Sequence, residues 1–201
     1  MTCESDMTMS SPAIYLLIQG IIGAKRARLI CVKEYVRPIA GQRILDVGCG
    51  PGYVVEYFPE SDYTGLDTDK KNIQYANYKY GQRGRFLCQE LNDESVEYLN
   101  PFDLIIMNGL IHHLSDAQVV ILFQRAKRIL KPGGKIVTLD GCYVNGQSII
   151  AKKLIGCDRG KYVRGERAYI ELASQEFDSI ITHIRSDLML IPYTIIIMQI
   201  S

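Results

Sequence analysis

Two groups of residues in this sequence have the types and spacing needed for ligand binding and for proton transfer. In the first, Gly48, Gly50 and Gly52 follow a short apolar segment, and Asp67 directly follows the next such segment. Glycine lets a tight turn adopt positive φ and lets the backbone approach a ligand closely. A carboxylate after a second strand suits the paired hydroxyls of a ribose. The pattern indicates a nucleotide-like ligand at the carboxyl ends of two strands.

The second group is a histidine pair. His112 and His113 are two of the three histidines in the chain, and they follow an apolar segment at residues 103–107. Histidine titrates near neutral pH and can take a proton from a hydroxyl or an amine, which typically speeds a reaction by about 10²- to 10⁴-fold. Adjacent side chains point in different directions, so we expect one of the two, His112 in preference, to face a substrate. A structural role for both remains open.

An α/β fold must position these residues, because strand-like and helix-like segments alternate along the chain. Helices are predicted after Pro12 and over residues 24–36, 115–130 and 166–174. For the third helix, Ser115 and Gln118 form a capping-box pattern, and Pro132-Gly133-Gly134 is interpreted as its stop. Strands are predicted at residues 43–47, 63–66, 85–89, 103–107, 135–139, 180–184 and 193–198.

Length and composition limit the class of protein further. The 201 residues are typical of one domain, and a net charge of +1, from 23 basic and 22 acidic residues, disfavours a nucleic-acid partner. Six cysteines without a Cys-x-x-Cys pair predict reduced thiols in a cytoplasmic protein, with no metal site. The apolar run at residues 13–23 is about half the length of a membrane span. It predicts an amphipathic helix packed on the core, with peripheral membrane contact as the alternative.

The segment ILDVGCGPG at residues 44–52 resembles the first motif of the class I (Rossmann-like) S-adenosylmethionine-dependent methyltransferases. FDLIIMNGLIHHL at 102–114 is similar to the family's fourth strand and following loop, and LKPGGKIV at 130–137 to the entry of its fifth strand. The resemblance covers residues 43–139 and points to the small-molecule type, with a type-11-like domain. It implies a three-layer fold whose seven-stranded, mostly parallel sheet has an antiparallel last strand. The implied cofactor is S-adenosylmethionine, which leaves as S-adenosylhomocysteine.

The resemblance also implies roles for individual residues. Asp46 and the glycines would line the methionine portion of the cofactor, Asp67 would hold the ribose, and Glu90 or the adjacent Gln89 would meet the adenine. Lys25, Arg26 and Arg28 are candidate cations for the cofactor carboxylate. The full predicted cofactor set is Asp46, Gly48, Cys49, Gly50, Gly52, Asp67, Thr68, Gln89, Glu90 and Asn108.

The same family pattern divides the single domain, residues 1–201, into three parts. Residues 1–38 would form a helical lid, in which Tyr15 could face the reacting centre together with His112 and His113. Residues 39–140 would form the cofactor-binding core, and 141–201 a substrate-binding insertion with the closing strands. A basic stretch at 152–167 could recognise a carboxylate or phosphate on a small-molecule acceptor, and the predicted substrate residues are Tyr143, Tyr162 and Arg164.

Three other functions stay open at this point. A nicotinamide-dependent oxidoreductase also uses a glycine turn and an acid, although the GxGxG spacing and the HHL and LKPGG motifs count against it. A non-catalytic cofactor-binding partner of another methyltransferase would keep the same core. A protein or RNA methyltransferase is disfavoured, because Asn108-Gly-Leu-Ile stands where an Asn/Asp-Pro-Pro-Tyr tetrapeptide would be expected.

Overall fold

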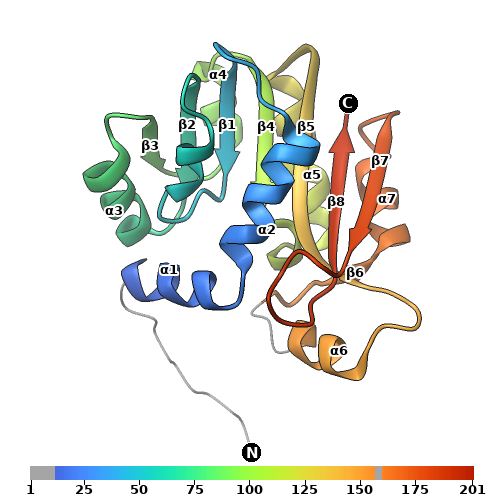
Figure 1. The fold of residues 1–201 in the computed structure, drawn as a ribbon. Coiled ribbons are helices and arrows are strands. Elements are labelled where there is room, and N and C mark those ends of the chain that lie inside the picture. Colours follow the sequence, from blue (N-terminus) through green and yellow to red (C-terminus); the bar gives the residue numbers. More distant parts are fainter. Residues whose placement is uncertain (1–11, 157–159) are drawn as a thin grey trace, which may run out of the picture.

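The computed structural model describes residues 12–156 and 160–201 and shows one central sheet covered by helices on both faces (Figure 1). The strand order is β3-β2-β1-β4-β5-β8-β7, and a two-residue strand β6, Arg164–Gly165, pairs with β5 outside this path. β8 runs antiparallel to both β5 and β7, whereas the other pairs along the path are parallel. This is the predicted Rossmann-like fold with an antiparallel last strand. The strands are β1 Arg43–Val47, β2 Asp62–Asp67, β3 Arg85–Cys88, β4 Phe102–Asn108, β5 Leu130–Tyr143, β7 Ile180–Arg185 and β8 Ile195–Ile200.

Helices connect the strands and form the outer layers. Two short 3₁₀ helices, Tyr53–Tyr57 and Ile111–His113, follow the ends of β1 and β4. A π-helix, Val32–Val36, continues the second α-helix. The α-helices are α1 Pro12–Ile21, α2 Ala24–Cys31, α3 Lys70–Tyr80, α4 Asp93–Tyr98, α5 Asp116–Arg128, α6 Ile149–Gly156 and α7 Glu166–Ala173.

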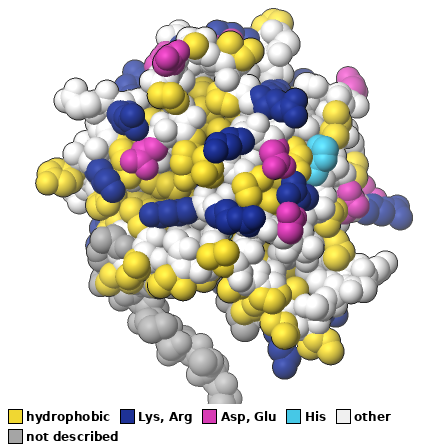
Figure 2. Space-filling model, in the orientation of Figure 1, with side chains coloured by type: hydrophobic (Ala, Val, Ile, Leu, Met, Phe, Trp, Pro, Cys, Tyr) yellow, Lys and Arg dark blue, Asp and Glu magenta, His cyan; other side chains and the backbone are white. Residues whose placement is uncertain are grey.

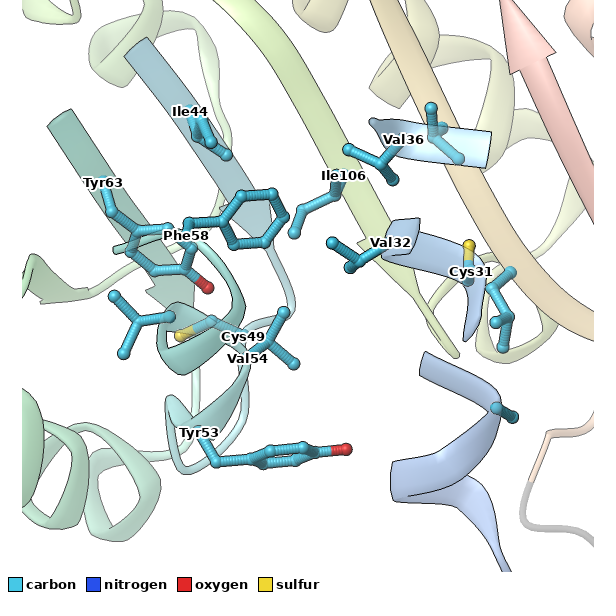
Figure 3. Packing of buried hydrophobic residues seen from close by; sticks show 14 of the residues in the cluster. Cys31, Val32, Val36, Ile44, Cys49, Tyr53, Val54, Phe58, Tyr63 and Ile106 are labelled. Atoms are coloured by element: carbon cyan, nitrogen blue, oxygen red, sulfur yellow. The ribbon is translucent and has the colours of Figure 1, made fainter. Parts of the chain in front are cut away.

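The core is divided into two halves by the sheet, because successive strand residues point to opposite faces. Ile44 of β1 packs on the face covered by α2, α3 and the first 3₁₀ helix, whereas its neighbour Leu45 packs on the face covered by α4, α5 and α7. Figure 3 shows Val32, in the continuation of α2, directed toward Ile106 of β4. Strands buried on both faces are continuous apolar runs, which is why the sequence pattern identifies them.

Some predicted boundaries are wrong. The helix predicted at 115–130 has the expected Ser115–Gln118 capping box, but it ends at Arg128. The Pro132-Gly133-Gly134 segment is the beginning of β5 rather than a helix stop, and the pairing of β5 with β4 shifts register there. In addition, α6 forms within a region for which no helix is predicted.

The carboxyl ends of β1, β2, β4 and β5 meet at one edge of the sheet, beside α1 and the start of α2 (Figure 1). In parallel sheets this edge is where ligands bind. Within residues 12–156 and 160–201, no helix is long and apolar enough to cross a membrane.

Candidate active site

Three adjoining cavities open at this edge of the sheet. A β2–α5 cavity of about 340 Å³ and a glycine-turn cavity of about 230 Å³ are both lined by Gly48, Asp67 and Leu110. An α1–β5 cavity of about 470 Å³ shares Tyr15, Arg28, Gly109 and His113 with the glycine-turn cavity. Because each neighbouring pair shares walls, the three form one cleft with the glycine turn in the middle. The predicted residues Asp46, Cys49, Gly50 and Asn108 line the glycine-turn cavity.

The glycine turn is held by hydrogen bonds between the ends of β1 and β2. The backbone N–H groups of Gly48 and Cys49 both donate to the Leu66 carbonyl, at 2.8 and 2.9 Å. The Gly50 N–H donates to Asp67 Oδ2 at 2.7 Å, and Gly50 has a φ of 55°. A Cβ built on Gly50 would meet no atom within 4 Å, so the turn leaves open space at this position.

At Gly52, close packing by neighbouring elements requires glycine. Its φ is 78°, and a Cβ there would lie 2.7 Å from Cβ of Ala76 and 2.8 Å from Cε1 of Phe86. These atoms belong to α3 and β3, which pack tightly on the turn. Gly52 is not among the residues that line the three cavities. Packing alone therefore accounts for glycine at this position, and the contact of Gly52 with the cofactor stays a prediction.

Asp46 brings a buried carboxylate to the glycine-turn cavity. Its Oδ2 accepts a short hydrogen bond from the Tyr63 hydroxyl, and its Oδ1 has no hydrogen-bond partner among the residues that the structure describes. Burial raises the pKa of Asp46 to about 7, against the opposing effects of the Tyr63 hydrogen bond and the Arg28 charge. An ammonium group in this cavity would satisfy the remaining oxygen and favour its charged form.

Of the three predicted cations, the structure places Arg28 at the cleft. Its Nη1 donates to Gln19 Oε1 at 2.8 Å and to the Tyr53 hydroxyl, and Arg28 lines both the glycine-turn and α1–β5 cavities. Arg26 instead donates to the backbone carbonyls of Asp187 and Leu188. Arg28 thus provides a positive charge beside Asp46 for an anionic group of a ligand.

Asp67 and the residues after β3 line the β2–α5 cavity. Besides Gly50, the Asp67 carboxylate accepts the N–H of Asp69 through Oδ1 at 2.8 Å, which fixes its orientation. Gln89 Oε1 accepts from the Tyr98 hydroxyl, while its buried Nε2 has no partner in the described part of the chain. Thr68 and Glu90 complete the predicted set in this cavity.

The far wall of the β2–α5 cavity is not among the predicted site residues. This wall comes from α5, where Gln118, Ile121, Leu122 and Arg125 face the end of β2. Ile121 is partly exposed on an otherwise polar side of the helix, and this apolar residue was the one hint in the sequence. Both walls of the cavity thus carry apolar side chains, among them Leu66 and Ile121, on which a planar ring can pack.

The histidine pair lies on the wall of the α1–β5 cavity. His112 is buried, and its Nδ1 lies 2.7 Å from Oδ1 of Asp140, at the carboxyl half of β5. His113 is exposed, contacts the His112 ring at a tilt of 38° with ring centroids 4.3 Å apart, and lines both the α1–β5 and glycine-turn cavities. Asp140 was missed as a site residue, although Asp46 and Asp67 are likewise acids in the carboxyl half of an apolar strand.

The remaining predicted residues divide into two groups. Tyr15 lies where the glycine-turn and α1–β5 cavities join, as the lid interpretation expects. Tyr143, Tyr162 and Arg164 do not line any of these three cavities. Arg164 is buried, with its guanidinium bonded to Asp116 and to the carbonyls of Ile111, Leu114 and Tyr162. These partners occupy its donors and favour a structural role, and the predicted role of Arg164 in substrate binding stays a prediction.

The sheet order, the glycine turn after β1 and the acid after β2 together define a class I methyltransferase fold. Residues 44–134 match the family model described as a methyltransferase domain. The chain therefore contains an S-adenosylmethionine-dependent methyltransferase domain of class I. S-adenosylmethionine is the cofactor of this class, and S-adenosylhomocysteine is its product.

Two curated relatives and a solved structure support this assignment. The chain is 35% identical to phosphoethanolamine N-methyltransferase 3 of Arabidopsis thaliana over 119 residues, which are 55% of this chain and 24% of that enzyme. It is 30% identical to a ubiquinone biosynthesis O-methyltransferase of Chromobacterium violaceum over 101 residues, 48% of this chain and 43% of that enzyme. The chain thus spans less than half the length of either relative.

The solved structure is the magnesium protoporphyrin IX methyltransferase of Synechocystis PCC 6803 with bound S-adenosylhomocysteine. It superposes with a TM-score of 0.69 at 18% identity, and the match covers 91% of this chain and 86% of that one. At this identity the likeness shows the common fold.

The residues of the cleft fit this cofactor on the chain's own geometry. The unpartnered oxygen of Asp46 suits an ammonium group, Arg28 a carboxylate, and the open space at Gly50 the close approach of a ligand. Asp67 stands between the glycine-turn and β2–α5 cavities, where a ribose would join an amino-acid chain to an adenine.

Proposed function

We propose that this protein transfers the methyl group of S-adenosylmethionine to a small-molecule acceptor bound in the α1–β5 cavity. The observation that carries the proposal is the continuity of the cleft. Of the two cavities that suit the cofactor, the glycine-turn cavity meets the α1–β5 cavity at Tyr15, Arg28 and His113. The methyl donor and its acceptor would therefore come together at a junction lined by a histidine and a tyrosine.

On the cofactor side, each residue has one task. Asp67 binds the ribose hydroxyls, and Glu90 or Gln89 binds the adenine edge between apolar walls. Asp46 and Arg28 bind the ammonium and carboxylate groups of the methionine portion, with Asn108 and the Gly48–Gly50 turn beside them. The bound cofactor supplies an electrophilic methyl group on a sulfonium.

On the acceptor side, the chain positions the acceptor and removes its proton. Holding the reacting atoms in line can contribute about 7–11 kcal/mol. With Nδ1–H donated to Asp140, His112 keeps the lone pair on Nε2 and can act as a general base toward a hydroxyl or amine. His113 and Tyr15 would contact the acceptor at the junction. Residues 12–38 of the predicted lid form one wall of the cleft, and residues 1–11 of it lie outside the described part.

Calorimetric titration with S-adenosylhomocysteine tests the cofactor site without knowledge of the acceptor. We expect micromolar binding that Asp67→Ala weakens at least tenfold, or about 1.4 kcal/mol. 5′-Methylthioadenosine, which lacks the amino-acid end, serves as the matched probe. Arg28→Met should weaken the binding of S-adenosylhomocysteine but leave the binding of 5′-methylthioadenosine unchanged. Asp67→Ala should weaken the binding of both compounds. Absence of S-adenosylhomocysteine binding by folded wild-type protein would refute the proposal.

The acceptor itself would be found by screening. The named relatives act on different atoms, one as an N-methyltransferase and the other as an O-methyltransferase, so neither acceptor is transferred to this chain. Release of S-adenosylhomocysteine in the presence of hydroxylated and amine-bearing compounds would identify the acceptor. The wall of the α1–β5 cavity favours compounds with an apolar body, because Leu139, Met189, Ile191 and Ile195 form much of it.

A further inference from the structure

Three segments around the α1–β5 cavity have an inner side that lines it and an outer side that is apolar and exposed. In α1, Tyr15 and Gln19 line the cavity, while Ile14 and Leu17 point to solvent, with 65% of Leu17 exposed. Ile21 is exposed as well, one turn beyond Leu17. A surface helix normally turns such a stripe toward the core.

The second and third segments repeat this arrangement. In the loop between β7 and β8, Met189 and Ile191 line the cavity, whereas Leu190 between them is 67% exposed. In α6, Leu154 lines the cavity, and Ile149, which is 75% exposed, and its exposed neighbour Ile150 face outward. We name Ile14, Leu17, Ile21, Ile149, Ile150 and Leu190 the apolar rim.

The members of the apolar rim lie at the same end of the molecule. The Leu190 N–H donates to the Ile22 carbonyl at 3.1 Å, which joins the β7–β8 loop to the end of α1. Figure 1 shows α1, this loop and α6 along the lower end, below the carboxyl ends of the strands. Isolated exposed apolar residues are common, but a group of this size around a cavity mouth marks an interaction site.

The charges near the apolar rim are almost all positive. Residues 12–33 contain Lys25, Arg26 and Lys33 besides the cleft residue Arg28 and no acidic residue, and residues 144–156 contain Lys152 and Lys153 and again no acid. In the β7–β8 loop the single acid is Asp187, which is paired with Arg185. In Figure 2 hydrophobic side chains gather along the lower edge over α1 and α6, with a basic side chain at the lowest point and acidic ones higher up.

We propose that the apolar rim docks this protein onto the surface of a lipid bilayer that carries anionic headgroups. Apolar side chains at the ends of short helices enter the boundary between headgroups and acyl chains, and lysines beside them are attracted to anionic lipid. The protein lies on the surface without spanning it. In this orientation the mouth of the α1–β5 cavity faces the bilayer, and, if the proposed function holds, an apolar acceptor enters from the lipid.

Sedimentation with vesicles tests the docking without any methyl transfer. The purified protein is spun with vesicles of phosphatidylcholine alone and of phosphatidylcholine mixed equally with phosphatidylglycerol. We expect the protein to bind the mixed vesicles. Its binding to vesicles of phosphatidylcholine alone should be at least tenfold weaker. The double variant Leu17→Ser/Ile149→Ser should lower binding at least tenfold, and Lys152→Gln/Lys153→Gln should lower it on the mixed vesicles. The matched control is Ile39→Ser, which changes an equally exposed residue before the amino end of β1 and should bind as wild type.

Binding of S-adenosylhomocysteine by every variant shows that it is folded and keeps this test separate from the proposed function. The docking proposal is overturned if wild-type protein stays in the supernatant with both vesicles, or if Ile39→Ser loses as much binding as the double variant. It is also overturned if light scattering shows a dimer that Leu17→Ser dissociates, because a second copy of the chain would then cover the rim. Vesicle binding without S-adenosylhomocysteine binding would refute the methyltransferase proposal while leaving the docking intact.

Discussion

His112 and Asp140 are 28 residues apart in the chain, yet His112 Nδ1 lies 2.7 Å from Asp140 Oδ1. The backbone N–H of His112 donates to the same oxygen at 3.2 Å, so the carboxylate holds both the ring and the chain that carries it. A buried carboxylate at Nδ1 selects the tautomer whose Nε2 accepts a proton. This relationship favours His112 over His113 as a general base, and that role stays a prediction.

Removal of either member of this pair should slow methyl transfer to a hydroxyl acceptor. We expect His112→Ala to lower kcat by about 10²- to 10⁴-fold, the usual contribution of a general base. Asp140→Asn should lower kcat by a similar order, because the ring loses its orientation and tautomer. Mass spectrometry of S-adenosylhomocysteine formation measures both rates. His183→Gln, which alters the remaining histidine on β7, is the control and should keep the wild-type rate. Full activity of His112→Ala, with loss of activity in His113→Ala, would assign the base to His113.

Most of the fold could be predicted from the sequence because the central strands β1, β4, β5 and β8 are buried on both faces over most of their length. Such strands appear in the sequence as continuous apolar runs. Along the main path, six of the seven strands begin within two residues of the predicted start, and β5 begins five residues earlier than predicted. The beginning of β5 was misread because proline and glycine normally end elements. At Leu130 the strand lies beside the first residue of β4 and tolerates a register shift. That tolerance depends on the neighbouring strand, which the local sequence does not contain.

The candidate site was predictable where a short motif carries it and unpredictable where distant segments meet. The glycine turn and Asp67 are encoded within 20 residues of chain. In contrast, Asp140 matters only because the loop after β4 places His112 beside it. Arg28 could not be separated from Lys25 and Arg26 until its contacts with Gln19 and Tyr53 were known. From the sequence, Arg164 is predicted to bind an anionic substrate. In the fold its guanidinium is bonded to Asp116 and to backbone carbonyls around the histidine pair.

Asp46 should make stability and cofactor binding respond to pH in opposite directions. Burial raises its pKa from 3.8 to about 7, so between these values the folded state keeps a proton that the unfolded chain releases. The contribution of Asp46 to the free energy of unfolding therefore falls as pH rises from about 4 to about 7. Asp46→Asn should thus be stabilised relative to wild type, increasingly so toward pH 7, in urea titrations at several pH values.

Asp46→Asn also tests how cofactor binding depends on pH. Wild-type Asp46 becomes charged as pH rises through about 7, so its affinity for the ammonium group of S-adenosylhomocysteine should increase over this range. Asp46→Asn should bind S-adenosylhomocysteine at least tenfold more weakly at pH 8, or about 1.4 kcal/mol, and keep its affinity for 5′-methylthioadenosine. If both probes weaken equally, Asp46 acts through the turn and not on the amino-acid end.

Gly50 and Gly52 should differ when each is replaced by alanine. Both have positive φ, which costs an alanine about 1 kcal/mol, but only Gly52 faces atoms within 3 Å. Gly52→Ala should therefore lower the free energy of unfolding by about 2–4 kcal/mol, since neither Ala76 nor the buried Phe86 ring can move freely. Gly50→Ala should lower the free energy of unfolding only by the cost of the positive φ, yet it should weaken the binding of S-adenosylhomocysteine. Gly146→Ala, at a positive φ with open space, controls for strain alone.

Arg164 should prove to be a structural residue of the histidine loop. Its guanidinium donates to the carbonyls of Ile111 and Leu114, which flank the histidine pair, at 3.2 and 2.6 Å. Arg164→Met would leave these carbonyls without their donor, and we expect the free energy of unfolding to fall by about 2–4 kcal/mol. Asp116→Asn is the matched control, because that carboxylate is 74% exposed and its ion pair with Arg164 should contribute less than about 1 kcal/mol. Urea unfolding measures both, and affinity for S-adenosylhomocysteine should be unchanged in each. An Arg164→Met protein with wild-type stability that loses turnover of an anionic acceptor would restore the substrate role that the sequence suggested.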